Sequence, residues 1–379
     1  AYLSDVDDVG VNRSVERFPN AKRYYDFREM LEKEHKHIDA VSVSIPDNCH
    51  AVAAMAAMQL GKHVYVQKPM THDIYETRML TESAKRYKVV TQMGNQGHAG
   101  AGTRLLREVV ESGAIGTVKE VHYWTNRPIW PQGMDRPSEA YNVPPTLDWN
   151  LWLGPAPERP YNPAYAPFRW RGWWDFGCGA LGDIAPHAMD AAFWTLNLGF
   201  PTRIEAETSP LYTETAPKMS RIVYEFPAKG SRPAVTVFWR DGGLTPARPA
   251  GYPADAPWPL GGDPGHQLWV GTDGMLVADV YGEGVRLVDP ARDRELKAHP
   301  PAEKYPRTGG VYKEWIAAIK GGTQPGSNFN GHSGPLTQMV LLGNFAVRMQ
   351  EPIILNSETG EIRNSGVPPE YLNPSYRKG

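Results

Sequence analysis

The first third of the chain alternates short strand-like and helical segments, and this alternation restricts the possible folds more than any other feature. The expected strands cover residues 1–5, 38–45, 63–66 and 89–92, and the expected helices cover 27–34, 51–60, 74–87 and 102–112. Strands separated by helices of this length indicate βαβ units and a parallel sheet. We therefore expect a doubly wound α/β arrangement in this part of the chain.

A different pattern begins at residue 118. Further strands, with only loops between the later ones, are expected at residues 118–126, 203–208, 221–226, 234–240, 268–272 and 275–280. Helical segments follow at residues 311–319 and 336–349. Successive strands joined by loops are typical of an antiparallel sheet. The sequence thus predicts a first domain over residues 1–116 and a second, mostly antiparallel domain over residues 117–379.

Polar residues follow each expected parallel strand. Ligands of such sheets bind at the carboxyl ends of the strands, which lie along one edge. The residues expected at this edge are Asp5, Pro46, Asn48, His50, Gln67, Lys68, Asn95 and Gln96. A structural role stays open for some of them, because Asp5 can cap a turn and Asn48 can cap the following helix.

The segment Gly182–His187 carries the strongest chemical signal. Asp183 and His187 are four residues apart at the start of an apolar run, Ala188–Leu198, that is typical of a helix. This spacing places the carboxylate and the imidazole on one helical face. A carboxylate beside a histidine raises its basicity, as a general base requires. With Lys68 at a strand end, where an ammonium can polarise a substrate oxygen, the pattern indicates proton chemistry on a hydroxyl or carbonyl group.

Composition excludes several classes of protein. The chain has 379 residues and a net charge of -2, with no basic stripe for nucleic acid. No run approaches the roughly 18 apolar residues of a membrane helix. The two cysteines, Cys49 and Cys178, have neither metal-type spacing nor a partner framework for disulfides. No pair of histidines has the His-x-x-x-His spacing of a metal site, so we expect no metal.

Aromatic residues are concentrated between Trp124 and Trp174, where seven of the twelve tryptophans lie. Ten prolines between Pro128 and Pro167 indicate a long loop. Such a loop is either held together by aromatic packing or forms a pocket wall whose rings stack on a substrate. The candidate substrate residues, here and further along, are Trp124, Asn126, Arg171, Trp174 and His266.

Five short patterns together resemble the Gfo/Idh/MocA family, named after glucose-fructose oxidoreductase, inositol dehydrogenase and a rhizopine-catabolism protein. They are residues 5–7 after a strand, Pro46–His50, Gly61–Pro69, Gly182–His187 and Gly334–Thr337. The resemblance covers nearly the whole chain. It implies a Rossmann domain, a substrate domain with an open-faced sheet, a nicotinamide cofactor, and sugars, cyclitols or glycosides as substrates. It also implies a homo-oligomer, because the family's exposed sheet face usually packs against another subunit.

The sequence departs from the family at two places. The family's Gly-x-Gly-x-x-Gly turn should lie about 20 residues before the ribose-binding acid, here Asp5. Only four residues precede Asp5, so we expect that roughly 30 or more residues with a central strand, between the strands at 1–5 and 38–45, are absent from this sequence. The second departure is Gln67, where the family usually has glutamate before Lys-Pro.

The resemblance implies a hydride transfer from a secondary hydroxyl to NAD. In that role His187 takes the hydroxyl proton, Asp183 orients it, and Lys68 binds the same oxygen. Asp5 as the ribose-binding acid favours NAD over NADP. Two alternatives stay open: a glycoside hydrolase that oxidises its sugar transiently, and a non-enzymatic carbohydrate-binding or regulatory paralogue without cofactor. Family members sometimes carry a twin-arginine export signal, so the resemblance leaves cytoplasm and periplasm both open.

Overall fold

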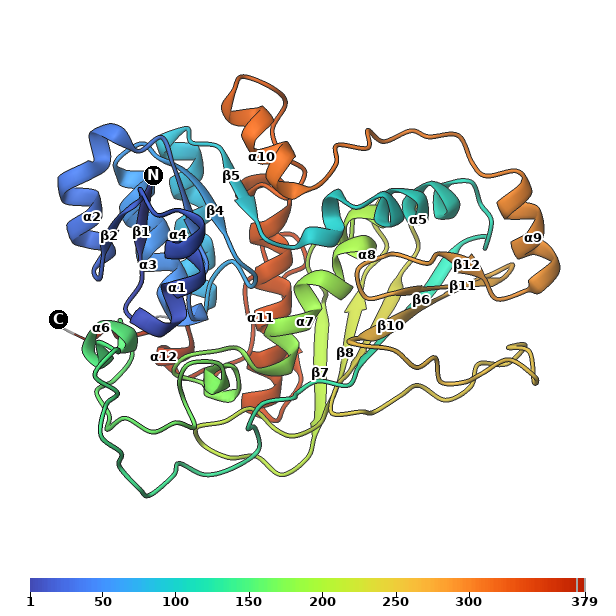
Figure 1. The fold of residues 1–379 in the computed structure, drawn as a ribbon. Helices are drawn as coiled ribbons and strands as arrows, with labels where there is room; N and C mark the ends of the chain where they lie inside the picture. The colour runs from blue at the N-terminus through green and yellow to red at the C-terminus, as the bar shows by residue number, and fades with distance from the viewer. Residues whose placement is uncertain (373, 378–379) are drawn as a thin grey trace.

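The computed structural model describes residues 1–372 and 374–377, and it contains two parts built on separate sheets (Figure 1). The first part is a parallel αβ structure that starts at the N-terminus. The second part is built on a large sheet, and helix α11 (Gly334–Met349) lies between the two in Figure 1. Among the described residues, no helix combines the length and apolar character needed to cross a membrane.

The parallel strands of the first part form two groups. Strand β1 (Tyr2–Ser4) pairs with β2 (Lys22–Tyr24), while β4 (His63–Val66) lies between β3 (Ala40–Val43) and β5 (Thr91–Met93). No strand among the described residues joins β1 to β3. This division falls where the sequence predicts the central strand of a dinucleotide-binding sheet to lie.

Five helices accompany these strands in the part of the chain that the structure describes. They are α1 (Asp8–Arg17), α2 (Phe27–Glu34), α3 (Asp47–Gln59), α4 (Ile74–Tyr87) and α5 (Ala101–Glu111). Local chemistry starts several of them: Asp26 caps α2 by accepting a hydrogen bond from the Arg28 amide, and Asp73 caps α4 through the Glu76 amide. Short 3-10 turns follow α2 (η1, His35–His37) and β5 (η2, Gln96–Ala99).

The second part is an eight-stranded sheet with the order β12-β11-β10-β6-β9-β8-β7-β13. Its strands are β6 (Val118–Thr125), β7 (Arg203–Thr208), β8 (Ser220–Phe226), β9 (Val235–Arg240), β10 (Gly265–Gly271), β11 (Met275–Asp279), β12 (Arg286–Leu287) and β13 (Ile353–Ile354). All pairs are antiparallel except β6 with β9. The mostly antiparallel sheet expected from the sequence is confirmed, with this one parallel pair added.

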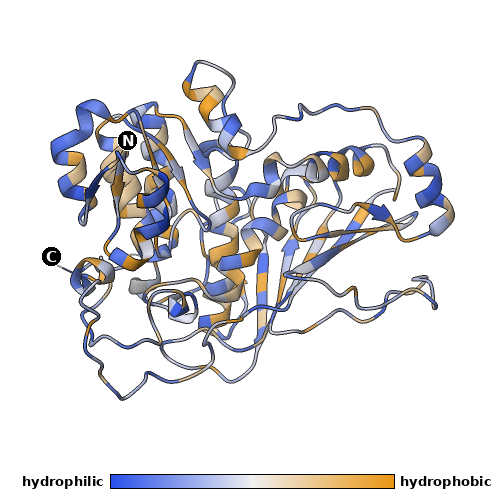
Figure 2. Cartoon of the chain, viewed as in Figure 1, coloured by the Kyte–Doolittle hydropathy of each residue, from blue (hydrophilic) through white to orange (hydrophobic). Residues whose placement is uncertain are grey.

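Helices cover one face of the large sheet (Figure 1). Helix α11 packs against β7 and β8, and residues along most of its length are buried and apolar (Figure 2). The other helices and helical turns after β6 are α6 (Trp149–Leu153), η3 (Arg169–Gly172), α7 (Gly179–Ala188), α8 (Asp190–Thr195), α9 (Pro290–Ala298), α10 (Val311–Ile319), the π-helical turn η4 (Phe329–Ser333) and α12 (Pro369–Leu372). Of these, α10 packs against β5 of the first part.

The helix that carries Asp183 and His187 differs from the sequence prediction. The apolar run predicts a helix over residues 188–198, whereas the structure has α7 ending at Ala188 and a separate short helix, α8. Helix α7 begins at Gly179, whose positive φ of 65° suits glycine. Because nearly every residue of α7 is buried, it has no polar stripe, and periodicity alone did not indicate where it starts.

The aromatic segment forms a small core of its own. Its buried members are Trp152, Leu153, Ala156, Tyr165, Ala166, Trp170, Trp173 and Phe176. The Trp173 side chain is fully buried, and its indole N–H donates to the Ala164 carbonyl over 2.8 Å. Packing therefore accounts for most of the tryptophan concentration.

We expect Trp173→Ala to lower the free energy of unfolding by about 3–5 kcal/mol, because it leaves a large cavity and an unpaired carbonyl. Chemical denaturation followed by fluorescence and circular dichroism measures the change. Tyr141→Ala, at a side chain in the same segment that is 54 % exposed, serves as the control and should change stability by no more than about 0.5 kcal/mol. Equal effects of the two substitutions would contradict a packed aromatic core.

Candidate active site

The structure brings Lys68 and Asp183 into direct contact. Lys68 follows β4, and Asp183 lies in the middle of α7, 115 residues further along the chain. The Lys68 Nζ atom donates to Asp183 Oδ1 over 2.7 Å and to the Asp183 carbonyl over 2.8 Å. Both side chains are largely buried, with 17 % and 15 % exposed. A strand end of the first part and a helix of the second therefore meet through a charged pair.

Asp183 is held in its ionised form. Burial raises the pKa of this carboxyl group, but the nearby Lys68 ammonium and Arg171 guanidinium outweigh burial, so its pKa lies below the usual value. Arg171 donates from Nε to Asp183 Oδ1 over 3.2 Å. Asp183 thus accepts from two cations, and its carboxylate is directed at Lys68 and Arg171.

His187 lies beside this pair as a neutral base. Its side chain is buried, and burial together with the Lys68 charge lowers its pKa to about 3. Among the described residues, its Nδ1 atom has no hydrogen-bond partner. Its ring contacts that of Tyr281 at a centroid distance of 5.1 Å. A neutral imidazole with a free nitrogen can accept a proton.

The spacing of Asp183 and His187 suggests a direct contact between them, but the structure shows no hydrogen bond between the two side chains. They lie one turn apart on α7, but the Asp183 oxygens bond to Lys68 and Arg171. Asp183 raises the pKa of His187 through its charge only, and this effect is smaller than the opposing ones. Asp183 therefore positions Lys68 rather than orienting the imidazole by a hydrogen bond.

The predicted cofactor residues have different environments. Asp5 accepts from the Asp7 amide over 3.0 Å, and burial raises its pKa. Pro46 precedes α3, and Asn48 in its first turn donates to the Leu153 carbonyl over 3.0 Å. The two ring nitrogens of His50 contact the Pro69 and Ile45 carbonyls. Asn48 and His50 thus brace the start of α3.

Gln67, Asn95 and Gln96 follow the ends of β4 and β5. Gln67 is half-buried, and its side chain makes no hydrogen bond to the described residues. Gln96 is exposed. Asn95 is fully buried and donates to Asp190 Oδ1 over 2.6 Å, away from the strand-end edge.

Asp190 is the centre of a buried polar cluster that sequence reasoning missed. His98 Nδ1 lies 3.0 Å from both Asp190 oxygens, and His332 Nε2 lies 2.6 Å from Oδ1. The ligand atoms of these three residues lie within 4.8 Å of one another, a spacing that a metal ion can use. Asp190 already accepts from these two rings and from Asn95, so hydrogen bonds satisfy it without an ion. Because these three residues are far apart in the sequence, no local sequence pattern indicates that they meet.

Two models of one protein family match successive parts of the chain. Residues 8–95 match the Gfo/Idh/MocA model described as an oxidoreductase family with an NAD-binding Rossmann fold. Residues 100–233 match the model described as the C-terminal alpha/beta domain of the same oxidoreductase family. The chain belongs to the Gfo/Idh/MocA family. The resemblance seen in the sequence is confirmed, and the first part is this family's NAD-binding Rossmann domain.

Curated relatives of this Gfo/Idh/MocA protein are distant. Levoglucosan dehydrogenase from Pseudarthrobacter phenanthrenivorans is 24 % identical over 179 residues, which cover 47 % of this chain and 38 % of that enzyme. Myo-inositol 2-dehydrogenase from Thermotoga maritima is 28 % identical over 114 residues, covering 30 % of this chain and 34 % of that enzyme. The matched segments thus span well under half the length of these relatives.

Solved structures share the fold over more than nine-tenths of the chain. WlbA dehydrogenase from Bordetella pertussis, solved with NADH and UDP-GlcNAcA, has a TM-score of 0.62 at 17 % identity and covers 94 % of this chain and 90 % of its own. Levoglucosan dehydrogenase, solved with NADH and levoglucosan, has a TM-score of 0.57 at 17 % identity, with 93 % and 89 % covered. At this identity the likeness establishes the fold alone.

Residues at the carboxyl ends of two strands fit bound NAD, one at its ribose and one beside Lys68. Asp5 directly follows β1 and has a carboxylate suited to ribose hydroxyls, and Gln67 directly follows β4 next to Lys68. Gly94 follows β5, and a Cβ there would lie 2.5 Å from the Gln67 amide oxygen, so the backbone of β5 passes close to the Gln67 side chain. The glycine-rich diphosphate turn is not among the described residues.

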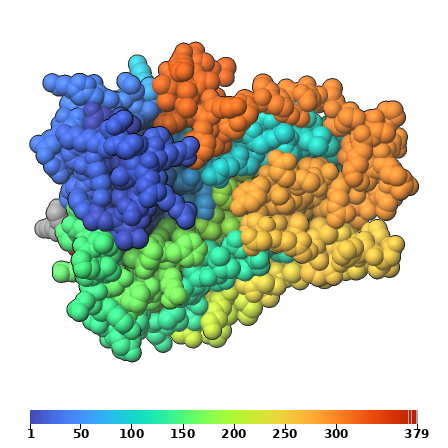
Figure 3. Space-filling model, in the orientation of Figure 1, coloured from blue at the N-terminus to red at the C-terminus, as the bar shows by residue number. Residues whose placement is uncertain are grey.

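The predicted substrate residues are divided among three places. Arg171 contacts Asp183, as described above. Asn126 donates to Asp263 over 3.0 Å, and His266 contacts the Gly261 carbonyl, both at one end of β6 and β10. Trp124 belongs to the same group: its ring lies 5.9 Å from that of His266 and packs against Trp258 and Tyr252. In Figure 3 the surface is hollowed between the blue first part and the teal and orange segments of the chain.

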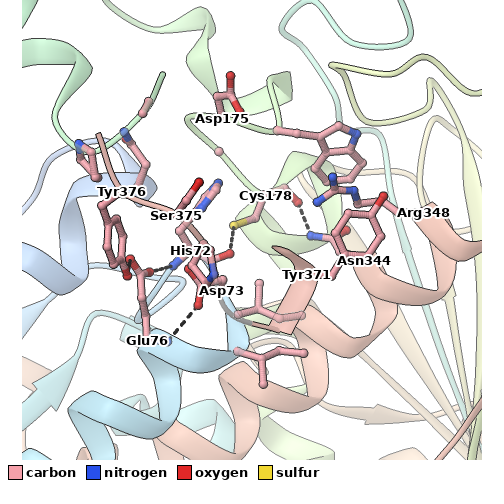
Figure 4. Close-up of a pocket in the computed structure, with 18 of the residues that line it drawn as sticks. His72, Asp73, Glu76, Asp175, Cys178, Asn344, Arg348, Tyr371, Ser375 and Tyr376 are labelled. Carbon is pink, nitrogen blue, oxygen red and sulfur yellow. Dashed lines mark hydrogen bonds between the residues drawn. The ribbon is translucent and has the colours of Figure 1, made fainter. Parts of the chain in front are cut away.

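Trp174 lies in a different cavity, shown in Figure 4. This cavity of about 270 Å³ is lined by the start of α4, the segment leading into α7, α11 and the chain near Tyr376. Arg348 lies over the rings of Trp174 and Tyr371. Lys68, Asp183 and His187 are not part of its lining. Trp174 therefore has a separate environment from the proposed chemistry.

Proposed function

We propose that this chain is an NAD-dependent oxidoreductase that oxidises a secondary hydroxyl group of a sugar, cyclitol or glycoside. The observation that carries the proposal is the buried Lys68–Asp183 pair beside His187, a neutral imidazole with a free Nδ1. Oxidation of a hydroxyl carbon requires a group that binds the oxygen and a base that takes its proton. Family membership and the dehydrogenase relatives support the same assignment.

Each residue has a defined part in this reaction. Lys68 donates a hydrogen bond to the substrate oxygen and stabilises the negative charge that develops there. His187 accepts the hydroxyl proton, so that the C–H bond breaks as the C=O bond forms. Asp183 holds the Lys68 side chain in place through its hydrogen bond. Bound NAD would supply the acceptor for the hydride that leaves the carbon.

Mass spectrometry of the small molecules released on denaturation tests the cofactor. We expect NAD or NADH when the purified protein holds its cofactor tightly, and added NAD should raise the melting temperature when the cofactor exchanges. Asp5 should disfavour the 2′-phosphate of NADP. Release of NADP would contradict the role of Asp5, and no release together with no stabilisation by NAD would contradict the proposal.

Substrate screening tests the reaction itself. We expect net NADH formation with one or more sugars, cyclitols or glycosides, measured by absorbance. Release of an aglycone without net NADH would replace the dehydrogenase with a glycoside hydrolase that oxidises its substrate transiently. A protein that binds sugar but neither NAD nor a hydride acceptor would instead be a carbohydrate-binding paralogue.

A further inference from the structure

A second buried carboxylate, Asp47, lies next to the proposed catalytic pair. Asp47 is the first residue of α3 and has only 4 % of its surface exposed. Its charge interacts with Lys68, Asp183 and Arg171, which approach it from β4, α7 and η3. The centre thus contains two carboxyl groups, and only one of them, Asp183, accepts side-chain hydrogen bonds from both Lys68 and Arg171.

The Asp47 side chain also connects the two parts of the protein. Its Oδ2 atom accepts the Cys178 backbone N–H over 3.1 Å, directly before α7 begins. The neighbouring Asn48 N–H donates to the Phe176 carbonyl over 3.2 Å. The start of α3 therefore holds the segment that leads, five residues later, to Asp183.

Cys178 makes hydrogen bonds to three different segments, so its position relative to Asp47 is well defined. Beyond the bond to Asp47, its carbonyl accepts from Asn344 of α11 over 2.8 Å. Its thiol donates to the His72 carbonyl over 3.6 Å, a bond drawn in Figure 4. Only the Asp47 bond involves a group that changes charge near neutral pH: burial raises the pKa of Asp47 to about 7, partly offset by Lys68.

We propose that Asp47 is a positioning residue of the catalytic centre, which holds the start of α7 and adds a second negative charge beside Lys68. This inference rests on the proposed function for its catalytic consequence, but the contact itself is independent of it. An ionised carboxylate accepts a backbone N–H more strongly than a protonated one. The hydrogen bond from the Cys178 N–H to Asp47 is therefore strong above neutral pH and weakens as Asp47 takes up a proton.

Amide hydrogen exchange of the segment 176–183 tests the contact without any substrate. We expect the protection factor of the Cys178 amide to rise about tenfold between pH 6 and 8 in the wild-type protein. Asp47→Asn keeps an acceptor oxygen, so its protection should stay within about threefold of wild type at pH 6 but lose this step. Asp47→Ala removes the acceptor and should lower protection about tenfold at pH 8.

Turnover as a function of pH tests the catalytic consequence. We expect kcat/KM to rise through an ionisation near pH 7 in the wild-type protein and to lose this limb in Asp47→Asn. Asp241→Asn is a matched control, because Asp241 is also buried with a pKa raised by burial to about 7 and accepts a backbone N–H from Ser220, but it lies in the large sheet. It should leave both pH profiles unchanged.

The outcomes separate the two proposals. A protection step that Asp47→Asn removes supports the positioning role even if no hydroxyl substrate is turned over, in which case the proposed function fails alone. Turnover without any protection step, or a step that survives in Asp47→Asn, overturns the role of Asp47. A purely structural contact would change protection in Asp47→Ala while leaving the neutral limb of kcat/KM in place in Asp47→Asn.

Discussion

Lys68→Ala is expected to lower kcat by about 10²-fold or more, which corresponds to at least about 2.7 kcal/mol of lost transition-state stabilisation. The ammonium donates to Asp183 and is the cation placed to bind the substrate oxygen as its charge develops. Alanine removes this donor and leaves Asp183 with Arg171 as its remaining cation. Initial rates of NADH formation with a responsive substrate measure the loss.

The control for Lys68 is Lys85→Ala, at an exposed position of α4. It should leave kcat unchanged. Melting curves of both variants establish that each remains folded, and bound NAD should be retained by both. Wild-type turnover in a folded Lys68→Ala variant would exclude this assignment of the catalytic centre.

His187→Ala is expected to have an effect of similar size, about 10²-fold or more on kcat, because a positioned general base contributes about 10²–10⁴-fold. The pKa of about 3 means that the imidazole is already unprotonated at pH 7 and needs no prior deprotonation. His187→Gln conserves polarity without a base and should be as impaired as alanine. The kinetic isotope effect with substrate deuterated at the reacting carbon shows whether chemistry limits the rate.

Two observations would separate catalysis by His187 from a packing role. His37→Ala, at an exposed histidine, should keep wild-type turnover and so controls for general effects of losing an imidazole. Near-normal kcat in His187→Gln would mean that hydrogen bonding suffices and that another group takes the proton. A large fall in melting temperature in His187→Ala would show instead that its contact with Tyr281 is mainly structural.

Much of the fold could be predicted because its local signals are strong. The expected bounds of α2, β4, α4 and α10 coincide with those observed. Each of these helices is amphipathic, and the strand is a short apolar run between a glycine turn and Lys-Pro. Helices α1 and α9 were missed because Val11 is the only buried residue of α1 and α9 has none, so no apolar stripe marks them.

The candidate site was predictable only in part. Spacing and motif singled out Lys68, Asp183 and His187, and the tertiary structure brings all three together. Their roles in catalysis, and the boundary at residue 116, stay predictions. Asn95 follows a strand as expected, yet the structure turns it into the core towards Asp190, a residue that no local pattern marks.

The sequence by itself determined which family the chain belongs to, the order of its elements and the residue types available for proton chemistry, because these depend on local propensity and short motifs. The tertiary structure alone decided which groups meet. Lys68 and Asp183 are far apart in sequence, and folding pairs them; burial then lowers the pKa of His187 and raises that of Asp47. Electrostatics in a buried site depends on distance and solvent exclusion, and neither can be read from spacing along the chain.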